Sequence, residues 1–163
     1  MRRALALAEQ GLREGELPIG SVVVLDDAVV AEAFWRGDPE RGVLGHPELL
    51  ALLEADRSIG RRRREATLYT TLEPCLMCMG AAMSFFLGIV VYALASPTDG
   101  AARVAAQWAP AAGHPEPSGR RSYGLPKIVA GVGREESAAL VRSYLRGGPS
   151  GPIAAFAGTL VNA

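Results

Sequence analysis

Cysteine is scarce in this 163-residue sequence, and its charged residues leave no excess of either sign. Two cysteines cannot form the disulfide framework of a small secreted domain. Spaced as Cys75-Leu76-Met77-Cys78, they suit metal or redox chemistry in a reducing compartment, so we expect a cytoplasmic protein. Seventeen basic residues balance seventeen acidic ones, so no global field steers the chain toward nucleic acid or an anionic membrane. The local run Arg61-Arg62-Arg63-Arg64 could contact nucleic acid, but such a run is more often a solvated helix end.

Long uncharged segments are also few. The apolar stretch that follows Arg2 and Arg3 stops at Glu9, too early for an export signal, and we interpret this segment as a helix. No residue from Cys75 to Pro97 is charged, which is long enough to span a bilayer. Glycine and serine interrupt this segment, and its last third is β-branched and aromatic. A buried helix followed by a buried strand therefore fits better than a membrane span, and we expect no membrane partner.

Hydrophobic periodicity predicts helices that alternate with strands. Helices are expected at residues 2–15, from 47, from 75, at 101–107 and at 135–145, and strands at 21–25, 28–34, 67–71, 89–94 and 128–130. This alternation favours one three-layer α/β domain, which we place at residues 1–146. A Gly/Pro-rich apolar tail, residues 147–163, follows it.

The two cysteines lie where the third expected strand gives way to a helix. At positions i and i+3, the sulfurs of Cys75 and Cys78 lie on one helix face. The positive end of the helix lowers the pKa of thiols there and favours thiolates, which are the metal-binding form. A Cys-x-x-Cys pair at such a junction is also compatible with a thiol–disulfide protein. A third metal ligand would favour a metal site over a thiol–disulfide protein.

His46 supplies that ligand at the start of the preceding helix, in His46-Pro47-Glu48. Two cysteines and one imidazole leave a tetrahedral zinc with one open position for water or hydroxide, which is the pattern of catalytic sites. Zinc lowers the pKa of such a water toward neutrality. Glu48 is then free to act as the general acid/base that moves a proton from water to a leaving amine. We therefore predict one zinc per subunit on His46, Cys75 and Cys78, with Glu48 catalytic.

A second copy of the histidine motif competes for this assignment. Gly113-His114-Pro115-Glu116 repeats Gly45-His46-Pro47-Glu48 letter for letter. The second copy runs into Pro117-Ser118-Gly119, which cannot start a helix, and it follows the cysteines in the chain. We predict that His46 is the ligand and that His114 is a loop histidine.

The combined His-x-Glu and Pro-Cys-x-x-Cys motifs are typical of zinc-dependent base deaminases. From about Met1 to Arg146 the sequence resembles the cytidine deaminase-like superfamily, above all bacterial tRNA-adenosine deaminases and the guanine and cytosine deaminases. Besides His46-Pro47-Glu48, the resemblance rests on residues 18–24 (PIGSVVV) and 68–82 (LYTTLEPCLMCMGAA). It implies an α/β/α fold with a central mixed five-stranded sheet and a homo-oligomer, most simply a dimer. It also implies hydrolytic release of ammonia from an aminated heterocycle.

Trp35, Pro74 and Asp99 are the expected substrate contacts. The resemblance implies that the backbone near Pro74 faces the departing amine and that the loop with Asp99 borders the pocket, although Asp99 could simply form a turn. Counted back from His46, Trp35 stands where tRNA deaminases usually have an asparagine that hydrogen-bonds the base. An indole can stack on a base or merely cover the sheet edge, but it cannot replace an amide.

The sequence favours a small substrate over nucleic acid. RNA binding depends heavily on phosphate contacts, and the expected basic end of the C-terminal helix is reduced to Arg142 and Arg146. We therefore expect a free nucleobase, a nucleoside or a related heterocycle of guanine or cytosine type. tRNA adenosine deamination is the alternative, and a thiol–disulfide protein is less favoured. The apolar tail is either disordered or folds over a neighbouring subunit's pocket, as in bacterial guanine deaminases.

Overall fold

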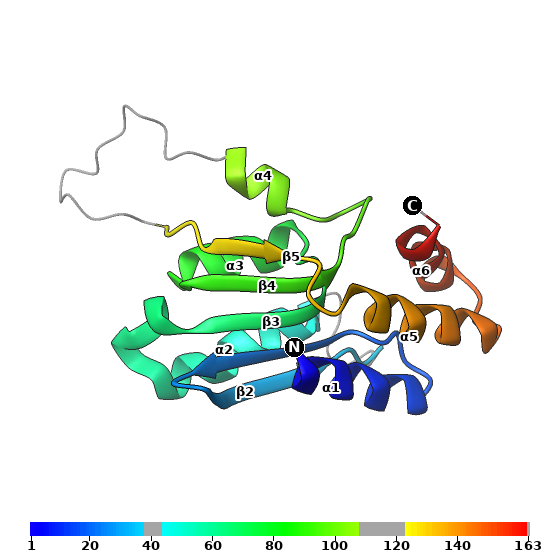
Figure 1. Ribbon diagram of the computed structural model, residues 1–163, viewed down its shortest axis with the longest axis horizontal. Helices are drawn as coiled ribbons and strands as arrows, with labels where there is room; N and C mark the ends of the chain where they lie inside the picture. The colour runs from blue at the N-terminus through cyan, green and yellow to red at the C-terminus, as the bar shows by residue number, and fades with distance from the viewer. Residues whose placement is uncertain (38–43, 108–122, 163) are drawn as a thin grey trace.

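The computed structural model describes residues 1–37, 44–107 and 123–162 (Figure 1). Within these residues the chain forms one five-stranded sheet in the order β2-β1-β3-β4-β5. The strands are β1 (Gly20–Leu25), β2 (Ala28–Phe34), β3 (Thr67–Leu72), β4 (Ile89–Leu94) and β5 (Lys127–Ala130). β1 pairs antiparallel with β2 and β3, whereas β4 runs parallel to both β3 and β5. The sheet is therefore mixed, and the expected α/β fold is confirmed.

Helices cover both faces of the sheet. In Figure 1, α1 (Arg2–Arg13) and α5 (Arg134–Arg146) lie in front of it, and α2 (Pro47–Ile59) and α3 (Leu76–Ser84) lie behind it. The short helix α4 (Ala102–Gln107) follows β4. The uncharged segment from Cys75 to Pro97 folds as α3 and β4, and no helix in the described ranges is long and apolar enough to cross a membrane.

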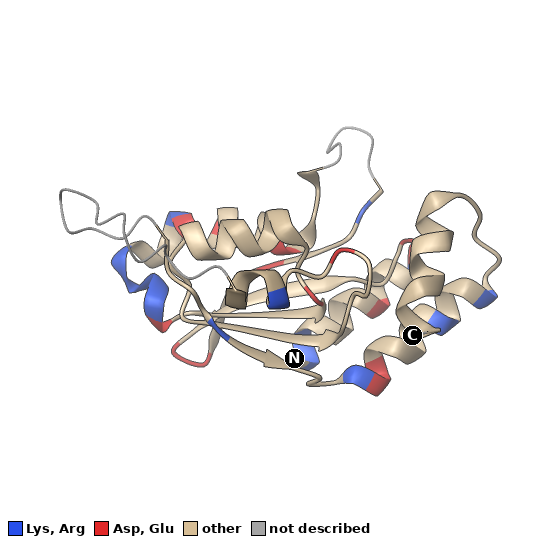
Figure 2. Ribbon diagram, turned by 90° about the horizontal axis from the view of Figure 1, so that it is seen from above, with Lys and Arg blue, Asp and Glu red and all other residues tan. Residues whose placement is uncertain are grey.

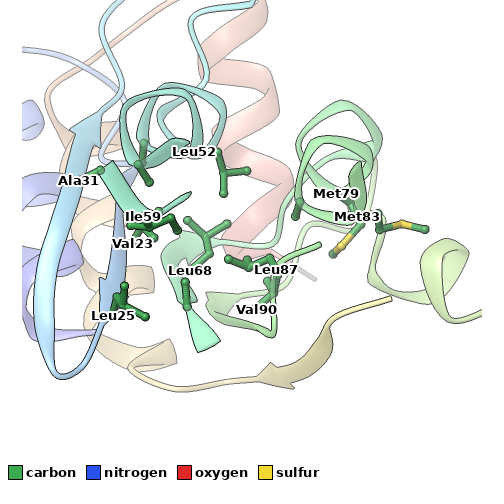
Figure 3. Packing of buried hydrophobic residues seen from close by; sticks show 14 of the residues in the cluster. Val23, Leu25, Ala31, Leu52, Ile59, Leu68, Met79, Met83, Leu87 and Val90 are labelled. Carbon is green, nitrogen blue, oxygen red and sulfur yellow. The ribbon is translucent and has the colours of Figure 1, made fainter. Parts of the chain in front are cut away.

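The core reflects the alternation of side chains along each strand. Val23, Leu68 and Val90 face α2 and α3, where they meet Leu52 and Met79 (Figure 3). On the opposite face of the sheet, Val22 of β1 lies in a buried apolar cluster with Ala4 and Leu7 of α1. Apolar packing thus joins helices to both faces of the sheet.

The arginine run forms a 3-10 helix, η2 (Gly60–Glu65), between α2 and β3. Arg62 makes two hydrogen bonds to the carboxylate of Asp26, at 2.7 and 2.8 Å, in the turn between β1 and β2. Arg63 pairs with Asp56, and the guanidinium of Arg64 lies over the Phe86 ring. These partners agree with the expectation of a solvated helix end.

The apolar tail contains a helix that the sequence analysis did not predict. α6 (Pro152–Val161) begins after Gly151, whose φ of 84° lets the chain turn back over α5. Its buried residues Ala157 and Leu160 join a cluster with Ile19, Leu72 and others at the end of the sheet. The alternative that the tail is disordered is therefore wrong for residues 152–161. In this chain the helix packs on its own domain.

Candidate metal and catalytic site

The amino ends of two helices bring the three predicted ligands together. His46 is the residue before α2, which starts with Pro47, and Cys75 is the residue before α3. Nδ1 of His46 lies 3.6 Å from Sγ of Cys75 and 3.5 Å from Sγ of Cys78. All three ligand atoms lie within 4.8 Å of one another. A tetrahedral zinc with ordinary Zn–N and Zn–S bonds separates such atoms by about 3.5 Å, so the donor set fits zinc in both chemistry and size.

Hydrogen bonds within this triad polarise the thiols. The pKa of Cys75 is lowered to about 4, first by the Cys78 thiol, which donates to it, and then by His46. The same contact and burial raise the pKa of Cys78, and the Cys75 thiolate raises the pKa of His46. Because zinc binds the thiolate form of cysteine, zinc binding by Cys75 and Cys78 would depend on pH.

Glu48 lies beside the triad, in the first turn of α2. Its side chain is buried, and burial raises the pKa of its carboxyl group. Oε1 accepts a hydrogen bond of 3.0 Å from the Thr70 hydroxyl. Oε2 lies 3.7 Å from Sγ of Cys78. The carboxylate is thus outside the ligand set but adjacent to it, which is the position that a proton carrier needs.

A hollow of about 260 Å³ opens onto these residues. His46, Glu48 and Cys75 lie in its wall, and so do two of the predicted substrate contacts, Trp35 and Asp99. The Trp35 ring meets the His46 ring edge to face, with centroids 5.3 Å apart and planes at 69°. Asp99 lies at the exposed rim, where it accepts a hydrogen bond from the Ser96 hydroxyl.

Pro74 does not line the hollow. Its side chain is fully buried, and its carbonyl accepts a hydrogen bond of 3.0 Å from the Ala101 N–H. A contact between the substrate and the backbone near Pro74 therefore stays a prediction. His114 lies outside the described residues.

The sequence analysis missed two parts of the site. The apolar residues Pro152, Ile153 and Phe156 of α6 complete the wall of the hollow. Thr70 contacts Glu48 from β3, at a position where the strand pattern predicts only core. A polar residue among buried apolar ones, and a Gly-Pro pair before an apolar run, were the available signals.

The fold and the site define a class: an α/β/α domain with a His–Cys–Cys zinc centre and a glutamate poised beside it. Residues 1–94 match the cytidine and deoxycytidylate deaminase zinc-binding region, and the chain belongs to this family. Zinc is bound by His46, Cys75 and Cys78. When bound, the ion supplies Lewis-acid activation of a water molecule.

Two curated relatives and two solved structures illustrate the range of similar proteins. The chain is 38% identical to a tRNA-specific adenosine deaminase of Bacillus subtilis (strain 168) over 101 residues, which are 61% of this chain and 63% of that protein. It is 30% identical to a tRNA-specific adenosine deaminase of Agrobacterium fabrum (strain C58) over 147 residues, 90% of this chain and 91% of that protein.

A solved structure from a study of A-to-I editing by tRNA deaminases at the wobble position matches with a TM-score of 0.68 and 30% identity. The match covers 86% of this chain and 96% of that one. The guanine deaminase of Bacillus subtilis matches with a TM-score of 0.53 and 33% identity, over 58% of this chain and 62% of that one.

Proposed function

We propose that this chain is a zinc-dependent hydrolytic deaminase that converts adenosine to inosine in tRNA. The likeness to the Agrobacterium tRNA-specific adenosine deaminase, over nine-tenths of both chains, is the observation that carries this proposal. This likeness favours tRNA as the substrate, whereas the sequence analysis favoured a free nucleobase or nucleoside and gave tRNA as the alternative. The zinc triad and Glu48 support the reaction, and the extent of the likeness supports the substrate.

The reaction replaces the amino group of the base by oxygen from water. A C–O bond forms at the carbon that bears the amine, the C–N bond breaks, and nitrogen leaves as ammonia. Glu48 takes one proton from the attacking water and delivers it to the leaving nitrogen, while the second proton of water ends on the ring nitrogen next to the new carbonyl group. Because burial raises the pKa of Glu48, its carboxylate accepts a proton more readily than an exposed one.

The hollow suits a single base. Its volume of about 260 Å³ is slightly below the about 300–1,000 Å³ of sites for drug-sized ligands. A deaminase must take its target base out of the stack and enclose it, and stacking on aromatic side chains holds such a base. Trp35 beside His46 offers this surface, and Asp99 at the rim offers an acceptor for a sugar hydroxyl or an amino group.

A free heterocyclic base is the second candidate, and α6 favours it. Pro152 and Ile153 place apolar side chains at the mouth of the hollow, where an RNA backbone would meet cations in a typical complex. Arg142 of α5 is 3.9 Å from Glu135, which reduces the charge it offers to phosphate. Figure 2 shows basic and acidic positions interspersed along the helices.

Parallel assays on the zinc-loaded protein separate the two substrates. Inosine is measured by mass spectrometry in digests of tRNA transcripts with adenosine at the wobble position. Ammonia release is measured with free adenine, guanine, cytosine and their nucleosides. Glu48→Gln is the matched control, which we expect to keep zinc and lose turnover.

Inosine in tRNA without ammonia from free bases supports the proposal. Ammonia from a free base without inosine overturns it in favour of the second candidate. Fully loaded protein that is inactive in both assays overturns deamination itself.

A further inference from the structure

Two buried hydroxyl groups lie in line behind the Glu48 carboxylate. Ser21 on β1 and Thr70 on β3 stand directly opposite each other in the antiparallel pair, and both are fully buried. The Ser21 hydroxyl donates to Oγ1 of Thr70 at 2.9 Å, and the Thr70 hydroxyl donates to Oε1 of Glu48 at 3.0 Å. We call this arrangement the Ser21–Thr70–Glu48 chain.

The chemistry of the groups fixes its direction. An ionised carboxylate only accepts hydrogen bonds, so Thr70 donates its single proton to Glu48. The oxygen of Thr70 is then left to accept, and Ser21 is the donor that satisfies it. Each group has one role, so the three side chains hold one another in a single arrangement.

The position of these two hydroxyls among apolar core residues indicates a specific role for them. Ser21 shares its sheet face with Val23, and Thr70 shares it with Leu68, both of which lie in the apolar cluster under α2. A hydroxyl buried there destabilises the fold unless it is hydrogen-bonded. The described partners of these two hydroxyls lead to one oxygen of one carboxylate.

The hydrogen bond from Thr70 occupies Oε1 of Glu48 and leaves Oε2 for the reaction. Oε2 lies 3.7 Å from Sγ of Cys78, which is one of the metal ligands. We propose that Ser21 and Thr70 are positioning residues that hold the Glu48 carboxylate with Oε2 toward the attacking water and the leaving amine. This inference rests on the proposed deaminase function.

The test compares variants of the full zinc-loaded chain, with the substrate found in the assays above. Thr70→Val keeps the shape of the side chain but removes its hydroxyl. We expect kcat to fall about 10-fold or more, since a misplaced catalytic group costs up to about 100-fold, with KM and zinc content unchanged. Thr70→Ser restores the hydroxyl and most of kcat. Ser21→Ala lowers kcat less, and it has no further effect in the Thr70→Val background because its route to Glu48 through the Thr70 hydroxyl is gone.

Thr71→Val is the matched control. Thr71 is the next residue of β3 and is also fully buried, but its hydroxyl accepts from the Gly20 N–H and lies 3.5 Å from the Pro18 carbonyl. We expect this variant to lose stability and keep kcat. An equal loss of kcat in Thr71→Val, or none in Thr70→Val, overturns the inference.

Crystal structures of the zinc-loaded wild type, Thr70→Val and Thr70→Ser give a readout that needs no substrate. We expect the Glu48 carboxylate to turn in Thr70→Val alone, and an unchanged carboxylate there overturns the inference. If the wild type deaminates nothing, the proposed function fails, yet these structures still decide the role of the hydroxyls. If the wild type is active and Thr70→Val equally so, only the positioning role fails.

Discussion

Gly100 lies so close to Glu73 that a Cβ at position 100 would come within 2.4 Å of the Glu73 carboxyl group. Glu73 accepts hydrogen bonds from the N–H groups of Ser96, at 3.1 Å, and Ala102, at 3.0 Å. Gly100 also forms an antiparallel bridge with Cys75. The buried Glu73 carboxylate thus holds the loop that contains Asp99, and the bridge with Cys75 joins the same loop to a metal ligand. Glu73 also lines the hollow.

Gly100→Ala tests how tight this contact is. The new methyl group would overlap Glu73 and also the Ser96 carbonyl, 2.6 Å away, so we expect a loss of about 1–3 kcal/mol in the free energy of unfolding, as in other overpacked cores. Gly80→Ala is the control, since nothing lies within 4 Å of a Cβ there and alanine favours the helix by about 0.5–1 kcal/mol. Denaturant unfolding measures both. Equal stability in the two variants would contradict the contact.

Glu73→Ala removes the acceptor rather than the space. Two N–H groups, one buried and one partly buried, lose their partner, and we expect the free energy of unfolding to fall by about 2–4 kcal/mol. Glu9→Ala, on the exposed face of α1, is the comparison and should change stability little. If the two substitutions have the same effect, Glu73 does not hold the loop.

Zinc content distinguishes the two copies of the histidine motif. The wild type is expected to contain one zinc per chain. We expect His46→Ala to lose it, because His46 lies within reach of both sulfurs. We expect His114→Ala to retain it, because His114 follows the cysteines in the chain and precedes Pro117-Ser118-Gly119, which cannot start a helix. Elemental analysis of the purified proteins measures this directly. Removal of zinc by a chelator should also lower the Tm of the wild type, since the metal binds only the folded site. Loss of zinc in His114→Ala would reverse the assignment.

Local chemistry made the zinc centre predictable from the sequence. Thiolates and an imidazole are the ligands zinc prefers, and Pro47 marks a helix start that can present His46. Chain order then selected this histidine over its duplicate. The strands were also recognisable from their β-branched and apolar residues: residues 28–34 and 89–94 match β2 and β4 to the residue.

Tertiary packing decides the features that the sequence did not reveal. α6 contains glycine and threonine, which are poor helix formers, and its stability comes from packing on α5 and the end of the sheet. The pairing of Ser21 with Thr70 depends on strand register, and their contact with Glu48 depends on where α2 lies over the sheet. No local pattern encodes these distances.

Phe156 of α6 offers the sharpest test of whether this helix serves the site. Phe156 and Leu145 are both half-buried in the same apolar cluster, but only Phe156 lines the hollow. We expect Phe156→Ala and Leu145→Ala each to lower the free energy of unfolding by about 1–3 kcal/mol, because each removes apolar contacts from that cluster. Only Phe156→Ala should raise KM, by about 3–10-fold with kcat little changed, as expected when a wall residue contributes equally to binding of substrate and transition state. Steady-state kinetics at matched zinc content measure the difference. A KM that rises equally in both variants would mean that α6 supports the fold and does not contact the substrate.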